Sequence, residues 1–137
     1  MLSKKILVID DEKDMTTVVK QMLERTGAYS VRVENDSLKG LAAVAAFKPD
    51  LILLDIMMPG MDGPEIARRI AADEATQSIP IIFFTGLLTE READEGGGFI
   101  GNYAVIAKPV TLEKLVAKVE EGLKQNEDWD GDSFAGE

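Results

Sequence analysis

Five short apolar segments alternate along the chain with segments of helical periodicity, and this alternation limits the fold more than any other feature. The apolar segments span residues 5–9, 29–33, 51–54, 80–84 and 104–107. After the first of them, apolar residues recur from Met15 to Leu23 at the i, i+3, i+4 and i+7 spacing of one helix face. This alternation predicts an α/β fold, a doubly wound parallel sheet with helices on both faces.

Capping and breaking residues mark the expected helix ends. Asp36 can cap a helix after the second strand, and Thr89 with Glu92 has the spacing of a capping box. Thr111 is expected to cap the last helix. The glycine run 96–98 must end the helix that Thr89 begins, because glycine favours the backbone that closes a helix.

The length and composition indicate one globular domain. The 137 residues are enough for a single compact domain with a sizeable core. The absence of cysteine excludes a disulfide framework and a thiolate metal site. No apolar run approaches the roughly 18 residues of a membrane span, and the first residues lack the apolar region of a secretion signal. We therefore expect a cytoplasmic protein with no membrane partner.

The net charge of −10 is unevenly spread. Residues 126–137 hold five acidic residues and no basic one. Because this segment is also poor in aliphatic residues, we expect a folded domain over residues 1–125 followed by an acidic, disordered tail. Neither part has a basic cluster, so direct nucleic-acid binding is disfavoured.

Charged and hydroxyl side chains stand at the carboxyl ends of four of the five expected strands. The first strand leads into Asp10 and Asp11, the third into Asp55, the fourth into Thr85 and the fifth into Lys108. In open parallel sheets, ligands bind at this edge, beside the point where the strand order reverses. We therefore expect these five side chains to meet at one rim of the sheet.

The residue types at this rim suit phosphoryl transfer. Three carboxylates at one edge repel each other unless a cation neutralises them, and magnesium prefers such oxygen ligands. Asp55 would then be the nucleophile, with Lys108 and the metal neutralising phosphoryl charge. Each residue alone has a simpler explanation: Asp11 as a helix cap, Thr85 as a β-former, Lys108 as a surface charge. Their joint occurrence at four strand ends favours the functional interpretation.

At these positions the sequence resembles the receiver domain of two-component response regulators, of the chemotaxis-regulator-like kind. The resemblance rests on ILVIDDE, LILLDIMMPGMDG, PIIFFTG and VIAKPV, in the family's order and spacing, and covers about residues 4–125. It implies a flavodoxin-like fold, with a five-stranded parallel sheet of order 2-1-3-4-5. The first and third strands would then be neighbours, so that their aspartates could share an ion.

Carried over by position, the resemblance implies a role for each rim residue. Asp55 would be the phosphoacceptor, Thr85 the switch hydroxyl and Lys108 the cation that pairs with the phosphoryl group. The implied cofactor is Mg²⁺, and its ligands would be Asp11, Asp55 and the backbone carbonyl of Met57, with Asp10 reaching it through water. A cis peptide bond between Lys108 and Pro109 is also implied.

The sequence departs from the family pattern on the face that receivers commonly use for output. The family usually has an aromatic residue three positions before the lysine, where this chain has Val105. The glycines at 96–98 are poor helix formers and loosen the fourth expected helix. The route from the site to the output surface is therefore not predicted by the resemblance.

The implied function is a phosphoacceptor signalling domain, not an enzyme with a separate substrate. It would take a phosphoryl group from a histidine kinase or phosphotransfer protein and act on a downstream protein. One alternative is a receiver module from a larger hybrid kinase or multidomain regulator. A phosphatase of the haloacid dehalogenase type would need a second aspartate where Met57 stands, and the complete acidic set argues against a degenerate scaffold. The resemblance also implies that the positions of Met57 and Leu87 border the path of the attacking water; because both residues are apolar, we predict slow loss of the phosphoryl group.

Overall fold

The computed structural model describes residues 3–135, with side chains described as far as residue 124. Six strands alternate with helices. The strands are Lys4–Ile9 (β1), Tyr29–Glu34 (β2), Leu51–Leu54 (β3), Ile81–Thr85 (β4), Phe99–Ile100 (β5) and Tyr103–Ala107 (β6). The helices are Lys13–Arg25 (α1), Gly40–Phe47 (α2), Gly63–Ala72 (α3), Glu90–Glu95 (α4) and Leu112–Ala135 (α5), with a 3₁₀ turn at Ser37–Lys39 (η1).

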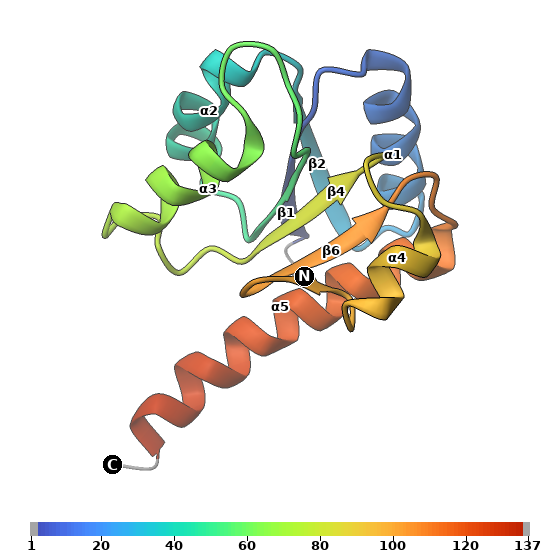
Figure 1. The fold of residues 1–137 in the computed structure, drawn as a ribbon. Coiled ribbons are helices and arrows are strands. Elements are labelled where there is room, and N and C mark those ends of the chain that lie inside the picture. Colours follow the sequence, from blue (N-terminus) through green and yellow to red (C-terminus); the bar gives the residue numbers. More distant parts are fainter. Residues whose placement is uncertain (1–2, 136–137) are drawn as a thin grey trace.

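The strands form one sheet of order β2-β1-β3-β4-β6-β5, in which all pairs except β5–β6 are parallel (Figure 1). The expected flavodoxin-like order is confirmed, with β6 as the fifth parallel strand. In the β1–β3 register, Ile9 lies opposite Leu54. The residues that follow, Asp10 and Asp55, therefore leave the sheet at the same level.

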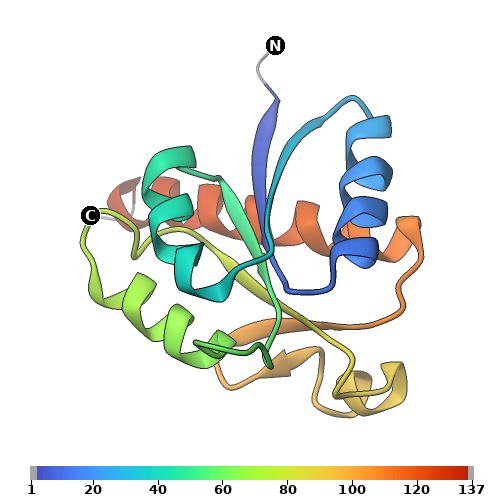
Figure 2. The same ribbon diagram turned by 90° about the horizontal axis from the view of Figure 1, so that it is seen from above.

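Helices cover both faces of the sheet, as the alternation predicts (Figures 1 and 2). Alternate residues of β1 belong to two different cores. Leu7 and Ile9 lie in the core that includes residues of α2, α3 and α4, whereas Ile6 and Val8 lie in the core that includes residues of α1 and α5. All four of these side chains have no exposed surface. A strand buried on both faces needs a continuous apolar run, which explains the sequence of β1.

The short strand β5 was not predicted. It pairs antiparallel with β6, so that Phe99 lies opposite Ala104 and Ile100 opposite Tyr103. The chain can turn this tightly because Gly97, Gly98 and Gly101 have positive φ angles of 74°, 82° and 59°. The glycine run therefore ends α4, as expected, but also builds a hairpin at the sheet edge.

The capping predictions hold in detail, with one change. The Thr89–Glu92 capping box is present, and Thr111 Oγ1 accepts a hydrogen bond from Lys114 N at 3.2 Å. Asp36 accepts from Leu38 N, but it caps the 3₁₀ turn η1 ahead of α2.

The backbone of α5 is helical as far as Ala135, beyond the expected domain boundary at residue 125. The side chains from residue 125 onward, and residues 136 and 137 altogether, lie outside the described part of the chain. The domain boundary and the disorder of the tail therefore stay predictions. Among the described helices, none is both long enough and apolar enough to cross a membrane.

Candidate functional site

The sheet brings the predicted carboxylates together at its carboxyl edge. One carboxylate oxygen from each of Asp10, Asp11 and Asp55 lies within 4.8 Å of the others. Asp10 has no exposed surface and Asp55 is 6% exposed, whereas Asp11 is open to solvent. The Asp55 N–H donates to Ile9 O at 3.0 Å, which fixes the backbone of the predicted phosphoacceptor against the end of β1.

Lys108 reaches the same cluster from the end of β6. Its Nζ lies 2.6 Å from Asp10 Oδ2, 2.7 Å from Glu12 Oε1 and 3.7 Å from Asp55 Oδ2. The side chain is 9% exposed, and the ammonium lies 5.4 Å from the centre of the Phe84 ring. The peptide bond that follows, Lys108–Pro109, is cis, as the resemblance to receiver domains implied.

Thr85 completes the rim at the end of β4. Its side chain is fully buried, and its Oγ1 accepts a hydrogen bond from Leu87 N at 3.0 Å. Because the oxygen is used here as an acceptor, the hydroxyl proton remains to be donated to another group. The neighbouring backbone is held by a bond from Lys108 N to Thr85 O at 2.8 Å, which ties the β4 and β6 ends together.

Burial and neighbouring charges shift the pKa values of Asp55 and Lys108. Burial, assisted by the charge of Asp10, raises the pKa of Asp55 from 3.8 to about 6, and Lys108 opposes this only in part. Burial by itself lowers the pKa of Lys108, but its contacts with Asp10 and Glu12 outweigh this and leave the pKa above its ordinary value. The site therefore holds excess negative charge that a bound cation would relieve.

The donor set fits magnesium. Asp10 Oδ2 is buried and has no hydrogen-bond partner of acceptable geometry within the described residues, although it lies close to Lys108. The single charge of Lys108 cannot neutralise three neighbouring carboxylates, and a buried carboxylate oxygen is stabilised by a further cation or water. The Met57 side chain is 65% exposed, and its thioether is a poor ligand for a hard cation. Residue 57 can thus serve only through its backbone carbonyl.

Comparison with known families agrees with this geometry. The family model of the response regulator receiver domain matches residues 6–120, which include all the rim residues. The chain belongs to the response regulator receiver domain family.

Curated relatives of this receiver domain include transcriptional regulators. The chain is 38% identical, over 98% of its length, to the phosphate regulon transcriptional regulatory protein PhoB of Pseudomonas aeruginosa, of which it covers 57%. It is 40% identical, over 90% of its length, to the nisin biosynthesis regulatory protein NisR of Lactococcus lactis, of which it covers 52%. The chain thus spans about half the length of these curated relatives.

Solved structures of receiver domains have the same fold over almost their whole length. The N-terminal domain of a response regulator receiver protein from Methanoculleus marisnigri is 42% identical, with a TM-score of 0.63, and the match covers 85% of this chain and 94% of that one. A CheY-like receiver domain protein from Methanospirillum hungatei is 28% identical, with a TM-score of 0.77 and coverages of 93% and 98%.

Two residues near the receiver site make contacts that the sequence did not predict. One is Glu12, which contacts Lys108. The other is Ser37, a buried side chain whose hydroxyl donates to Pro59 O and accepts from Met61 N at 3.0 Å. Ser37 thereby holds the loop that follows Asp55. A serine after a helix-capping aspartate gives no sequence signal of this long-range contact.

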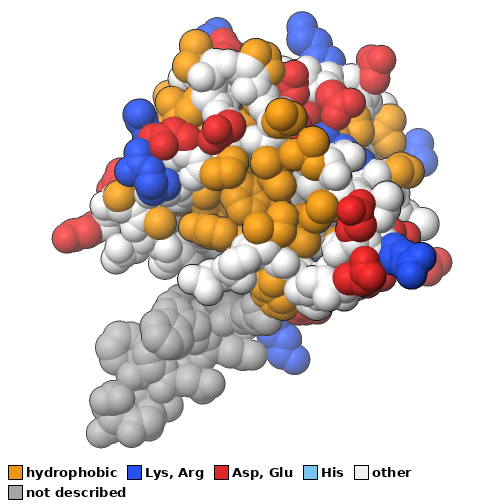
Figure 3. Space-filling model, viewed as in Figure 1, with side chains coloured by type: hydrophobic (Ala, Val, Ile, Leu, Met, Phe, Trp, Pro, Cys, Tyr) orange, Lys and Arg blue, Asp and Glu red, His pale blue; other side chains and the backbone are white. Residues whose placement is uncertain are grey.

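Within this receiver domain, the region around α4 departs from the family pattern and is less well packed than the rim. Val105 is buried in β6 where an aromatic residue was expected. Tyr103, two residues earlier, packs edge-on against Phe83, with 5.2 Å between the ring centroids. The helix α4 has a single buried residue, Ala93, and Glu90 pairs with Lys114 of α5 at 2.6 Å. Figure 3 shows a broad apolar surface over the strands between α3 and α4.

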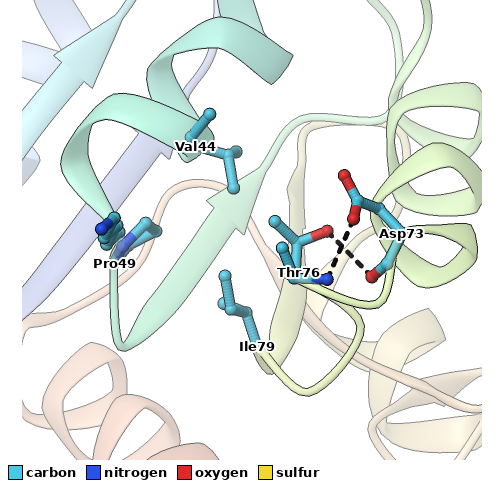
Figure 4. Close-up of a pocket in the computed structure, with 8 residues that line it drawn as sticks. Val44, Pro49, Asp73, Thr76 and Ile79 are labelled. Atoms are coloured by element: carbon cyan, nitrogen blue, oxygen red, sulfur yellow. Dashed lines mark hydrogen bonds between the residues drawn. The ribbon is translucent and has the colours of Figure 1, made fainter.

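A separate cavity lies at the opposite edge of the sheet. It measures about 470 Å³ and is bordered by the C-terminal end of α2 and the loop before β4 (Figure 4). Its walls include Val44, Pro49 and Ile79, with Asp73 and Thr76 at its polar side. Pro49 and Ile79 precede the amino ends of β3 and β4, so this cavity is separate from the carboxyl-edge site.

Proposed function

We propose that the chain accepts a phosphoryl group on Asp55 from a histidine kinase or phosphotransfer protein, and signals through protein contacts. The observation that carries this proposal is the clustering of Asp10, Asp11 and Asp55 within 4.8 Å beside Lys108. A purely structural cluster would not need three carboxylates, two of them buried, at the mouth of one core.

In the proposed reaction, an Asp55 carboxylate oxygen attacks the phosphorus of the donor. A P–O bond to Asp55 forms as the bond to the donor nitrogen breaks, and the donor imidazole leaves with the electron pair. Lys108 pairs with a phosphoryl oxygen, and the Thr85 hydroxyl donates to another. Mg²⁺, held by Asp11, Asp55 and the Met57 carbonyl, with Asp10 through water, would supply neutralisation of the phosphoryl charge.

We propose that output passes through a partner protein or a neighbouring part of a longer regulator, in the cytoplasm. Relatives such as PhoB are named as transcriptional regulators, but this chain spans about half of their length. The net charge of −10 and the absence of a basic cluster from the sequence disfavour direct contact of this domain with nucleic acid.

The proposal is tested by incubating the chain with acetyl phosphate, with and without Mg²⁺. We expect an acid-labile phosphoryl group at close to one per chain, formed only with the metal. Failure to form any stable label would overturn the proposal. Steady release of phosphate from several phosphate esters would instead identify a phosphatase.

A further inference from the structure

The Lys108 ammonium directs its hydrogen bond away from the phosphoacceptor. Its Nζ donates to Glu12 Oε1 at 2.7 Å but lies 3.7 Å from Asp55 Oδ2. Asp10 Oδ2 is only 2.6 Å away, yet it lacks the alignment of a hydrogen bond. In the unphosphorylated chain, Lys108 is therefore held by Asp10 and Glu12, both nearer to it than Asp55, and Glu12 is the exposed partner of the two.

Local structure places Glu12 for this contact. Its backbone N–H donates to Asp10 Oδ1 at 3.0 Å, which holds residue 12 beside the cluster. It occupies the N-cap position of α1, but its side chain makes no capping hydrogen bond. Nor is it one of the three carboxylates that could share a metal ion. Its carboxylate is 59% exposed, so that its contact with Lys108 can break without leaving a buried charge.

We propose that Glu12 is a positioning residue that holds Lys108 in the unphosphorylated state and competes with the phosphoryl group for it. This inference rests on the proposed function, because it takes Lys108 to be the partner of the phosphoryl oxygen. As the ammonium moves from its present position, 3.7 Å from Asp55 Oδ2, towards a phosphoryl oxygen, its bond to Glu12 lengthens and the Glu12 carboxylate is hydrated. No covalent bond changes at Glu12. Its carboxylate therefore slows phosphorylation by reducing the fraction of Lys108 that faces Asp55.

The test compares Glu12→Gln with a matched control, Asp14→Asn, in the full chain. Asp14 is an exposed acidic residue in the first turn of α1, so that its replacement removes the same charge from the same turn. Phosphorylation by acetyl phosphate is followed at saturating Mg²⁺. We expect Glu12→Gln to be phosphorylated about two- to fivefold faster than the wild type, the range that an exposed ion pair supports. Asp14→Asn should change the rate by less than about 1.5-fold. Equal effects of the two substitutions, or a slower Glu12→Gln, would overturn the proposal.

A second measurement needs no phosphodonor and separates this inference from the proposed function. The ¹³Cε and ¹⁵Nζ resonances of Lys108 report its partner directly. We expect Glu12→Gln to shift them in the unphosphorylated chain and Asp14→Asn to leave them unchanged. Unshifted Lys108 resonances in Glu12→Gln would show that Glu12 does not hold the ammonium, whether or not Asp55 accepts a phosphoryl group.

Discussion

Two regions of the domain differ in how well their backbones are packed. One is the rim at the ends of β1 and β3, and the other is the segment from Gly86 to Gly101. The residues of β3 have no exposed surface, and their register with β1 delivers Asp10 and Asp55 to the same level. In residues 86–101, only Ala93 and Gly98 are buried. The proposed phosphorylation site thus lies at the end of a buried, apolar sheet. The conformational change that follows phosphorylation is expected in the segment from Gly86 to Gly101, which has little packing to resist movement.

Two phenylalanines, one in the core and one in the segment from Gly86 to Gly101, provide the strongest test of this difference in packing. Phe84 is 2% exposed in the core under Lys108, whereas Phe99 of β5 is 42% exposed. We expect Phe84→Ala to lower the free energy of unfolding by about 3–5 kcal/mol, because it leaves a large cavity. Phe99→Ala should lower it by less than about 1 kcal/mol. Urea unfolding of both variants measures the difference, and similar losses would show that the segment packs as firmly as the core.

A second prediction concerns Asp55 in the absence of metal. Burial raises its pKa to about 6, so that the native state takes up a proton between about pH 4 and pH 6 that the unfolded chain releases. This contribution to stability is lost as the pH rises through 6. At pH 7 without Mg²⁺, Asp55→Asn should therefore be more stable than the wild type, by on the order of 1–2 kcal/mol after allowance for solvent screening.

The matched control for this substitution lies in the exposed segment. Asp94 of α4 is exposed, so Asp94→Asn should change the free energy of unfolding by less than about 0.5 kcal/mol. The gain of Asp55→Asn should disappear below about pH 4, where Asp55 is protonated in both the native and unfolded states. If Asp55→Asn were less stable than the wild type at pH 7, the claim that the metal-free site holds excess buried negative charge would be refuted.

The third prediction is about the lifetime of the phosphoryl group. Met57 and Leu87 are 65% and 53% exposed beside the rim, and neither side chain can orient an attacking water. We expect Met57→Asn combined with Leu87→Glu to speed loss of the phosphoryl group about tenfold, or ~1.4 kcal/mol in the barrier. Val18→Gln, which changes an exposed apolar residue of α1, is the control. An unchanged decay in the double variant, with phosphorylation intact, would show that these side chains do not set the lifetime.

The smallest effect is expected in amide exchange. When Thr85 is drawn towards a phosphoryl group, the segment from Gly86 to Gly101 should absorb the movement, because it has few buried contacts. Amide exchange there should slow several-fold on phosphorylation, which is about 1 kcal/mol of local stability. The fully buried strands β1 and β3 should show no comparable change. If amide exchange changed only in β1 and β3, the proposal that the segment from Gly86 to Gly101 absorbs the movement would be wrong.

The sequence predicted the rim well because the sheet determines it. Apolar runs such as Leu51–Leu54 are typical of buried strands, and parallel strands end at one edge of the sheet. Asp10, Asp55 and Lys108 were therefore expected at the same edge, where the structure places them. The strand order and the role of each residue came from resemblance to the receiver family. Periodicity and spacing in one sequence do not determine which strands are neighbours.

The remaining features depend on tertiary contacts that leave no local signal. The two residues of β5 are too few to show strand periodicity, and their pairing depends on glycines with positive φ. Ser37 reads as a capping residue, but its hydroxyl binds a loop more than twenty residues away. Glu12 reads as a solvated charge beside two aspartates, and only the position of Lys108 shows its partner.

The central claim is that the sheet presents Asp55, and not another carboxylate of the cluster, for phosphorylation. Mapping the label tests this most directly: the chain is treated with acetyl phosphate and Mg²⁺, the acyl phosphate is trapped by reduction with borohydride, and the modified peptide is sequenced. We expect the label on Asp55 alone and no label in Asp55→Asn, while Asp94→Asn is labelled like the wild type. Label on Asp10 or Asp11 in the wild type, or an undiminished label in Asp55→Asn, would contradict the account.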